Sequence, residues 1–125
     1  MIAGIGTALV AVARMGDLYV RHGVRALDKI LAPAERDDFI KAKNPGRFLA
    51  KRFAAKEAFG KALGIGVTPP ATLANVAVIH DELGKPAFAY APELAQLLAE
   101  RGVCAHLSIS DEKEFATAFV VLETL

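Results

Sequence analysis

The 125-residue sequence contains one cysteine, no tryptophan and no long apolar run. A single cysteine excludes an intramolecular disulfide and is typical of a reducing compartment, so we expect a cytoplasmic protein. Cys104 lies between Val103 and Ala105, and we expect it to be a small residue of the core. No apolar run approaches the roughly 18–20 residues of a membrane span, and no basic segment precedes an apolar stretch at the N-terminus. The sequence therefore predicts neither a membrane helix nor a signal peptide.

Charge of one sign and aromatic side chains are also scarce. The formal net charge is +1, so overall charge does not indicate a nucleic-acid partner. Aromatic residues make up 7% of the chain, which argues against a surface that stacks on bases. By contrast, 54% of the residues are hydrophobic, enough for the core of one domain over residues 1–125. So high a fraction in a small chain also predicts apolar surface buried in an oligomer.

Hydrophobic periodicity and turn residues predict strands and helices in mixed order. Expected strands cover residues 1–9, 75–80, 86–90, 103–110 and 115–122. Expected helices cover residues 10–22, 27–31, 32–42, 45–63 and 92–101. The adjacent strands read as antiparallel hairpins, so we expect the α+β class, with an antiparallel sheet and a long central helix.

The central helix has clear start and stop signals. Asn44-Pro45 provides a cap and a first-turn proline, and Gly64 follows the last helical residue. At 100° per residue, Arg52 and Lys56 fall within the arc that carries its phenylalanines. A solvent-exposed helix would keep its charges away from this arc, so other parts of the protein or a ligand must meet these two cations.

Glu57 and Lys61 lie one turn apart on a different face of the same helix. They fit an ordinary i,i+4 ion pair worth about 0.2–0.5 kcal/mol. They also fit a metal-ligating carboxylate followed by a phosphate-facing lysine. Spacing leaves both interpretations open.

Two further patterns carry alternatives. Gly4 and Gly6 alternate in the first strand, which indicates close approach of either a packed neighbour or a ligand. Arg14 and Arg21 lie seven apart on one helical face, and Arg25 extends their ridge if the helix does not break at Gly23. The ridge is either a solvated face or a docking surface for an acidic partner.

Three stretches together resemble the holo-(acyl-carrier-protein) synthases, the small bacterial phosphopantetheinyl transferases. They are GIGTALVAVARM at Gly4–Met15, FLAKRFAAKEAFGKALGIG at Phe48–Gly66 and HLSISDEKEFATAFVVLE at His106–Glu123. KEAFGKALG is the most specific part, and the order and spacing of all three motifs agree with the family. The similarity covers nearly the whole chain.

The resemblance implies Mg²⁺-dependent transfer of 4'-phosphopantetheine from coenzyme A to a serine of apo-acyl carrier protein, a step of fatty acid biosynthesis that releases adenosine 3',5'-bisphosphate. It implies the phosphopantetheinyl transferase fold, assembled as a homotrimer with active sites between subunits. Glu57 matches the metal carboxylate and Lys61 the lysine that faces the pyrophosphate. The other matched positions are a coenzyme-binding set, Arg52, Gly64, Ile65, Gly66, Gly84, Lys85, Pro86 and His106, and a carrier-docking set, Arg14, Arg21 and Arg25.

One departure bears on the metal. The family's first motif carries an aspartate that is the second magnesium ligand, and this sequence has Ala8 there. An alanine cannot ligate a cation, so we expect reduced magnesium affinity and turnover. Ile65 stands where relatives usually show a small hydroxyl residue. The alternative function is a non-catalytic module that binds coenzyme A or a carrier protein.

Overall fold

The computed structural model describes all 125 residues. Its helices and strands are, in chain order, β1 (Ile2–Ala11), α1 (Val12–His22), α2 (Val24–Ile30), α3 (Arg36–Lys41), α4 (Pro45–Leu63), β2 (Val76–His80), β3 (Pro86–Tyr90), α5 (Pro92–Arg101), β4 (Val103–Asp111) and β5 (Phe115–Thr124). Two 3-10 turns, η1 (Pro33–Glu35) and η2 (Leu73–Asn75), precede α3 and β2. The α+β class and the long central helix are confirmed. No helix is both long and apolar enough to cross a membrane.

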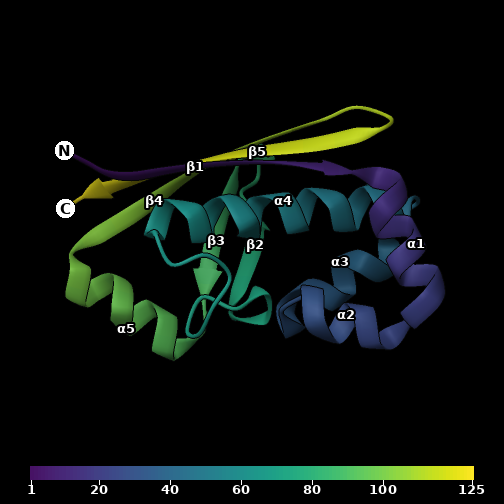
Figure 1. The fold of residues 1–125 in the computed structure, drawn as a ribbon, viewed down its shortest axis with the longest axis horizontal. Helices are drawn as coiled ribbons and strands as arrows, with labels where there is room; N and C mark the ends of the chain where they lie inside the picture. Colours follow the sequence, from purple (N-terminus) through teal and green to yellow (C-terminus); the bar gives the residue numbers. More distant parts are fainter.

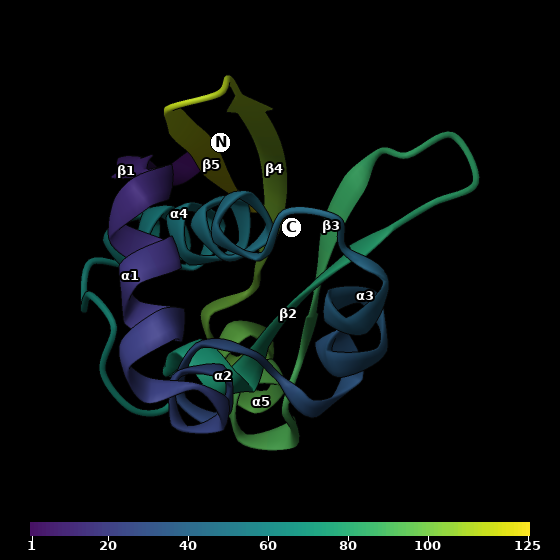
Figure 2. The same ribbon diagram turned by 90° about the vertical axis from the view of Figure 1, so that its right-hand side faces the viewer.

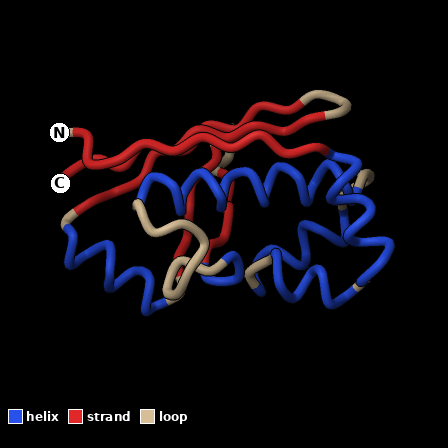
Figure 3. Tube along the Cα trace, viewed as in Figure 1, coloured by secondary structure: helices blue, strands red, loops and turns tan.

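The strands form two antiparallel sheets. Three strands pair in the order β1-β5-β4, and β2 pairs with β3 in a separate hairpin. Figures 1 and 3 show α4 lying lengthwise under the three-stranded sheet, with α1, α2, α5 and the hairpin on its other side. Figure 2, the end view, shows the β2–β3 hairpin standing beside β4. The central helix is therefore enclosed on both sides, and its face toward the sheet and its opposite face must both be apolar or internally paired.

Glycines in β1 allow the strand to lie directly on α4. A Cβ added at Gly4 would stand 2.1 Å from the carbonyl oxygen of Ala62, and one at Gly6 would stand 2.0 Å from that of Ala58. Real side chains cannot approach so closely, so only glycine permits this contact. Of the two sequence-based alternatives, the alternating glycines therefore serve packing against a neighbouring helix.

The predicted ends of α4 are confirmed. The Asn44 side chain accepts a hydrogen bond from the Arg47 backbone N–H, Pro45 occupies the first turn, and Gly64 adopts a left-handed conformation. The edge strands run further than predicted because the β1–β5 pairing continues to Ala11. Consequently α1 begins two residues later than expected.

The upper face of the three-stranded sheet in Figure 1 has no element above it. Even-numbered residues of β1 and β5 face α4 and are buried, whereas the odd-numbered side chains point outward. Among those, Ile5 is 59% exposed, Leu9 68% and Phe119 47%. We call this surface the outer sheet face. A single chain therefore leaves a large apolar surface in water.

Candidate functional site

The two cations in the apolar arc of α4 have partners inside the chain. Arg52 and Lys56 are 5% and 1% exposed, and both bind the buried carboxylate of Glu35. The Arg52 Nη1 donates to Glu35 Oε2 at 2.8 Å and to the Val78 carbonyl at 2.8 Å. The Lys56 Nζ also donates to the carbonyl oxygens of Ile30 and Leu73. This network joins α4 to η1, α2 and β2, so it explains both cations without a ligand.

Electrostatics within this network favour the ion pairs. Burial by itself would raise the pKa of Glu35, but Lys56 and the hydrogen bonds from Val78 and Arg52 hold that pKa below its ordinary value of 4.5. Burial lowers the pKa of Lys56 from 10.5 to about 8, although Glu35 works in the opposite direction. The Glu35 carboxylate is therefore charged at neutral pH.

The other face of α4 lines a pocket of about 580 Å³. Glu57 is its only carboxylate, and the basic groups around it are Arg14, His22, Arg25 and Lys29. The apolar part of its wall comes from Leu18, Ala26, Ile30, Phe53, Val67 and Leu73. We call this the Glu57 pocket. It offers a long apolar surface bordered by positive charge, a combination suited to a ligand with an aliphatic arm and an anionic end.

The expected arginine ridge is divided. Gly23 has a φ of 53° and ends α1, so Arg25 belongs to α2. Arg14 and Arg25 line the Glu57 pocket, but Arg21 does not. Within α1 the pocket is lined by residues spaced four apart, Arg14, Leu18 and His22, and the sequence reasoning missed His22 because it followed a seven-residue spacing.

Glu57 and Lys61 do not pair with each other. The Lys61 Nζ donates instead to the Thr7 carbonyl oxygen at 2.9 Å. Ala8 is 5% exposed and faces α4. Along β1, Gly4 lies against Ala62 of α4 and Gly6 lies against Ala58. If this spacing continues, position 8 lies against the turn around Ala54, about one turn before Glu57. Position 8, Glu57 and Lys61 thus belong to one neighbourhood, and its only carboxylate is Glu57.

The segment after α4 folds back on the helix. The Gly66 N–H donates to the Gly60 carbonyl at 3.0 Å, and a Cβ at Gly60 would stand 2.6 Å from the Gly66 carbonyl oxygen. Ile65 packs against the core. Gly64, Ile65 and Gly66 do not line the Glu57 pocket, although the next residue, Val67, does.

A second pocket, of about 300 Å³, lies between the β2–β3 hairpin and β4. Its wall includes three residues of the predicted coenzyme set, Arg52, Gly84 and Pro86. Lys85, between the last two, is exposed and lies outside the wall. Sequence reasoning missed its other polar members, Lys51, His80 and Asp111. Burial, followed by the nearby Arg52 and Lys51, lowers the pKa of His80, so its imidazole is disfavoured as a cation.

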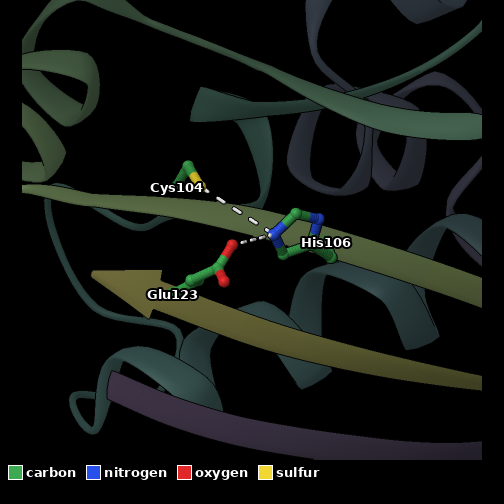
Figure 4. A group of neighbouring side chains, drawn as sticks. All are labelled: Cys104, His106 and Glu123. Carbon is green, nitrogen blue, oxygen red and sulfur yellow. Dashed lines mark hydrogen bonds and ion pairs between the residues drawn. The ribbon is translucent and has the colours of Figure 1, made fainter. Parts of the chain in front are cut away.

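His106 lies away from both pockets, on the outer sheet face. Its Nε2 is 2.9 Å from Glu123 Oε1 and 3.9 Å from Cys104 Sγ (Figure 4). The expectation that Cys104 is a core residue is wrong. In β4 it is only partly buried and points to the same face as His106, two residues on, because side chains alternate along a strand.

Within one chain, then, the predicted residues are dispersed. Glu57, Arg14 and Arg25 line the Glu57 pocket, Arg52, Gly84 and Pro86 line the smaller pocket by the hairpin, and His106 lies on the outer sheet face. The remaining predicted residues line neither pocket: Arg21, Lys61, Gly64, Ile65, Gly66 and Lys85. His106 therefore lies on the outer sheet face, whereas Glu57 lines a pocket whose other walls come from α1, α2 and the residues after α4.

Comparisons with known proteins agree with this fold. The 4'-phosphopantetheinyl transferase superfamily (ACPS) matches residues 4–120. A holo-(acyl-carrier-protein) synthase from Dechloromonas aromatica (strain RCB) is 61% identical over 123 residues, covering 98% of both chains. The crystal structure of the synthase from Neisseria meningitidis is 45% identical, with a TM-score of 0.96 over 99% of this chain and 100% of that one. The synthase from Bacillus anthracis, solved in complex with CoA (3',5'-ADP), is 34% identical, with a TM-score of 0.84 over 100% and 99%.

Proposed function

The chain belongs to the holo-(acyl-carrier-protein) synthases of the 4'-phosphopantetheinyl transferase superfamily, and from this premise we propose that it transfers 4'-phosphopantetheine from coenzyme A to apo-acyl carrier protein. The acceptor is a serine hydroxyl and the by-product is adenosine 3',5'-bisphosphate. The observation that carries the proposal is the Glu57 pocket, where one carboxylate stands among four basic groups beside an apolar wall. A cytoplasmic location is part of the proposal.

Glu57 and Lys61 have distinct roles in the proposed reaction. The serine oxygen forms a bond to the β-phosphorus of coenzyme A, while the bond between that phosphorus and the bridging oxygen of the diphosphate breaks. Glu57 accepts the serine proton, directly or through one water. The Lys61 ammonium leaves the Thr7 carbonyl and stabilises the negative charge that grows on the departing bisphosphate. Basic groups around the pocket hold the phosphates in place.

This site supplies few protein ligands for a metal ion. Magnesium prefers oxygen ligands and is often held by one or two carboxylates together with substrate phosphates and waters. The residues here supply Glu57 alone, and the one group of three potential metal-ligating residues in the chain does not include it. Glu57 can hold the ion only with ligands from substrate and water, and the ion when bound would neutralise phosphate charge. We therefore infer that Ala8 weakens magnesium binding and lowers turnover.

The outer sheet face supports a homotrimer. Exposed Ile5, Leu9 and Phe119 would be covered by a neighbouring chain, and the contact would bring His106 of one subunit toward a pocket of another. Such an arrangement would unite the residues that a single chain keeps apart. Arg14, Arg21 and Arg25 are all exposed at the mouth of the Glu57 pocket or next to it, and they form the proposed docking surface for the acidic carrier.

The experiment compares the Ala8 chain, which is either an engineered variant or a natural form of low activity, with Ala8→Asp and Ala8→Asn across a magnesium titration. The mass gain of phosphopantetheine on apo-carrier protein is followed by mass spectrometry. We expect Ala8→Asp to reach half-maximal rate at a lower magnesium concentration, and Ala8→Asn to resemble the Ala8 chain. Asparagine matches aspartate in size, so it controls for the effect of a larger residue at a buried position.

Equal turnover of the Ala8 chain and Ala8→Asp at limiting magnesium would overturn the inference about Ala8. Glu57→Gln should abolish transfer in every background. If neither the Ala8 chain nor Ala8→Asp modifies the carrier although both bind coenzyme A, the non-catalytic binding module is the correct function instead.

A further inference from the structure

A thiol, an imidazole and a carboxylate converge on the outer sheet face. Cys104 and His106 come from β4, and Glu123 from β5 is the register partner of Cys104 (Figure 4). One ligand atom from each lies within 4.8 Å of the others. Cys104 is partly buried, whereas the His106 and Glu123 side chains are 59% and 52% exposed. The Glu57 chemistry described above leaves Cys104 and Glu123 without a role.

We propose that Cys104, His106 and Glu123 form a binding site for Zn²⁺ or a similar transition-metal ion, with a water as fourth ligand. Zinc is commonly bound by cysteine sulfur, histidine nitrogen and carboxylate oxygen in tetrahedral geometry. Bond lengths of about 2.0–2.3 Å at tetrahedral angles separate the ligand atoms by about 3.4–3.6 Å. The observed separations, 3.9 Å from sulfur to nitrogen and 2.9 Å from nitrogen to oxygen, lie on either side of that value.

The backbone already supplies most of the required geometry. Residues two apart in a strand point to the same face, and register partners on neighbouring strands place their Cβ atoms about 4.5–5.5 Å apart. Cys104 therefore lies next to both other ligands, and all three sit on a regular part of the sheet. Metal entry would require the His106–Glu123 hydrogen bond to open by roughly half an ångström. The Cys104 Sγ and the Glu123 carboxylate oxygen, which lie within 4.8 Å of each other, would have to come to about 3.5 Å through rotation of their side chains.

The ligand set distinguishes this site from the magnesium position at Glu57. Magnesium favours all-oxygen surroundings, while thiolate and imidazole favour zinc and related ions. A thiolate and a carboxylate together neutralise the two positive charges of the ion. The occupied site would therefore present no net positive charge to a phosphate, and the His106 Nε2 would no longer be free to donate a hydrogen bond.

A consequence for coenzyme binding rests on the proposed function, in which His106 contacts the coenzyme phosphates. If His106 serves both ligands, the metal and the coenzyme weaken each other's binding. Zinc would then inhibit the transferase by competition at His106, whatever its effect at the magnesium position.

The first experiment measures metal binding directly. Tag-free full-length protein is titrated with Co²⁺, whose thiolate charge-transfer absorption reports ligation by Cys104, and Zn²⁺ is then used to displace it. We expect a one-to-one complex in the unsubstituted chain. The charge-transfer band should be lost in Cys104→Ser, and the affinity should fall about 10- to 100-fold in Glu123→Gln. Glu93→Gln, which changes an exposed carboxylate on α5, should leave the affinity unchanged.

The proposal is wrong if saturating cobalt gives no thiolate band, or if Glu123→Gln binds cobalt as tightly as Glu93→Gln. Circular dichroism confirms that each variant folds, and Cys104→Ala replaces Cys104→Ser if the latter does not. Cobalt binding by the unsubstituted chain is decisive independently of any variant.

The second experiment measures the binding of adenosine 3',5'-bisphosphate with and without Zn²⁺. This product has no thiol, so it cannot bind the metal as coenzyme A would. Weaker bisphosphate binding with zinc in the unsubstituted chain, but not in Cys104→Ser, supports competition at His106. If cobalt binds as expected and bisphosphate affinity does not change, the metal site stands and the coenzyme role of His106 fails. If bisphosphate binds but cobalt does not, the metal site fails and the proposed function is untouched.

Discussion

Replacing the buried Glu35 by glutamine tests whether the network around α4 holds the fold together. The carboxylate accepts four hydrogen bonds, from the backbone N–H groups of Ala32 and Val78, from Lys56 Nζ and from Arg52 Nη1. Glutamine has the same shape but replaces one accepting oxygen with a donating NH₂ group. Whichever way the amide turns, that group faces one cation and one backbone N–H.

The expected loss follows from these contacts. Two buried donors without an acceptor cost about 1–3 kcal/mol each. In addition, Arg52 and Lys56 remain buried without the negative charge that compensated them, although Lys56 keeps its bonds to Ile30 and Leu73. Removing one partner of a buried ion pair typically costs about 3–5 kcal/mol. Because this figure already includes the cost of the donors left without an acceptor, we expect Glu35→Gln to lower the free energy of unfolding by about 3–5 kcal/mol in total.

Urea unfolding followed by far-ultraviolet circular dichroism measures this loss, since the chain has no tryptophan to serve as a fluorescence probe. All variants are compared at one protein concentration, because association would add to apparent stability. Asp38→Asn is the matched control: its carboxylate is 57% exposed and 3.7 Å from Arg52 Nη2, so its loss should stay below about 1 kcal/mol. A loss for Glu35→Gln no larger than that for Asp38→Asn would refute the reasoning.

Three further predictions concern acid stability, the packing of a glycine and association of the chain. Because the pKa of Glu35 in the folded chain lies below 4.5, its contribution to stability is complete above about pH 4.5 and is lost as pH falls through the folded pKa, so Glu35→Gln should flatten the acid limb of a stability–pH profile. Gly6→Ala should lower the free energy of unfolding by about 3 kcal/mol or more, since its Cβ would stand 2.0 Å from a carbonyl oxygen of α4. Gly102→Ala is the control and should cost about 1 kcal/mol, because φ is +64° there but the space is open. Similar losses for the two variants would contradict the close contact. On the proposed trimer, Phe119→Glu should lower the mass measured by light scattering to that of a monomer, whereas Leu83→Glu, at a 96% exposed position, should not. An unchanged mass for both would argue against the outer sheet face as the interface.

Local signals in the sequence were sufficient for most elements. The cap at Asn44, the glycine at Gly64 and the alternating strands depend on neighbouring residues, and each was confirmed. The boundary of β1 was predicted too short because its last residues are held by pairing with β5, more than 100 positions away. The prediction that Cys104 lies in the core was wrong because its small side chain fits either side of a strand, and only the packing of the sheet on α4 decides which side is buried.

The candidate site, like the fold, was predicted only in part. The positions of Arg52 and Lys56 within the apolar arc followed from helical periodicity, but their partner Glu35 did not, because 17 and 21 residues separate it from them. Likewise, the motif around Glu57 indicated the family, yet the basic lining of its pocket came from two helices whose relative placement depends on the break at Gly23.

By itself, then, the sequence determined the order of most helices and strands, the family and the absence of a carboxylate at position 8, since each depends on residue type and short-range spacing. The tertiary structure alone decided which charges are internally paired, that Glu57 lines a pocket while His106 lies on the outer sheet face, and that a thiol meets an imidazole and a carboxylate on that face. Those outcomes depend on contacts between segments distant in the chain, and such contacts are set by packing rather than by local preference.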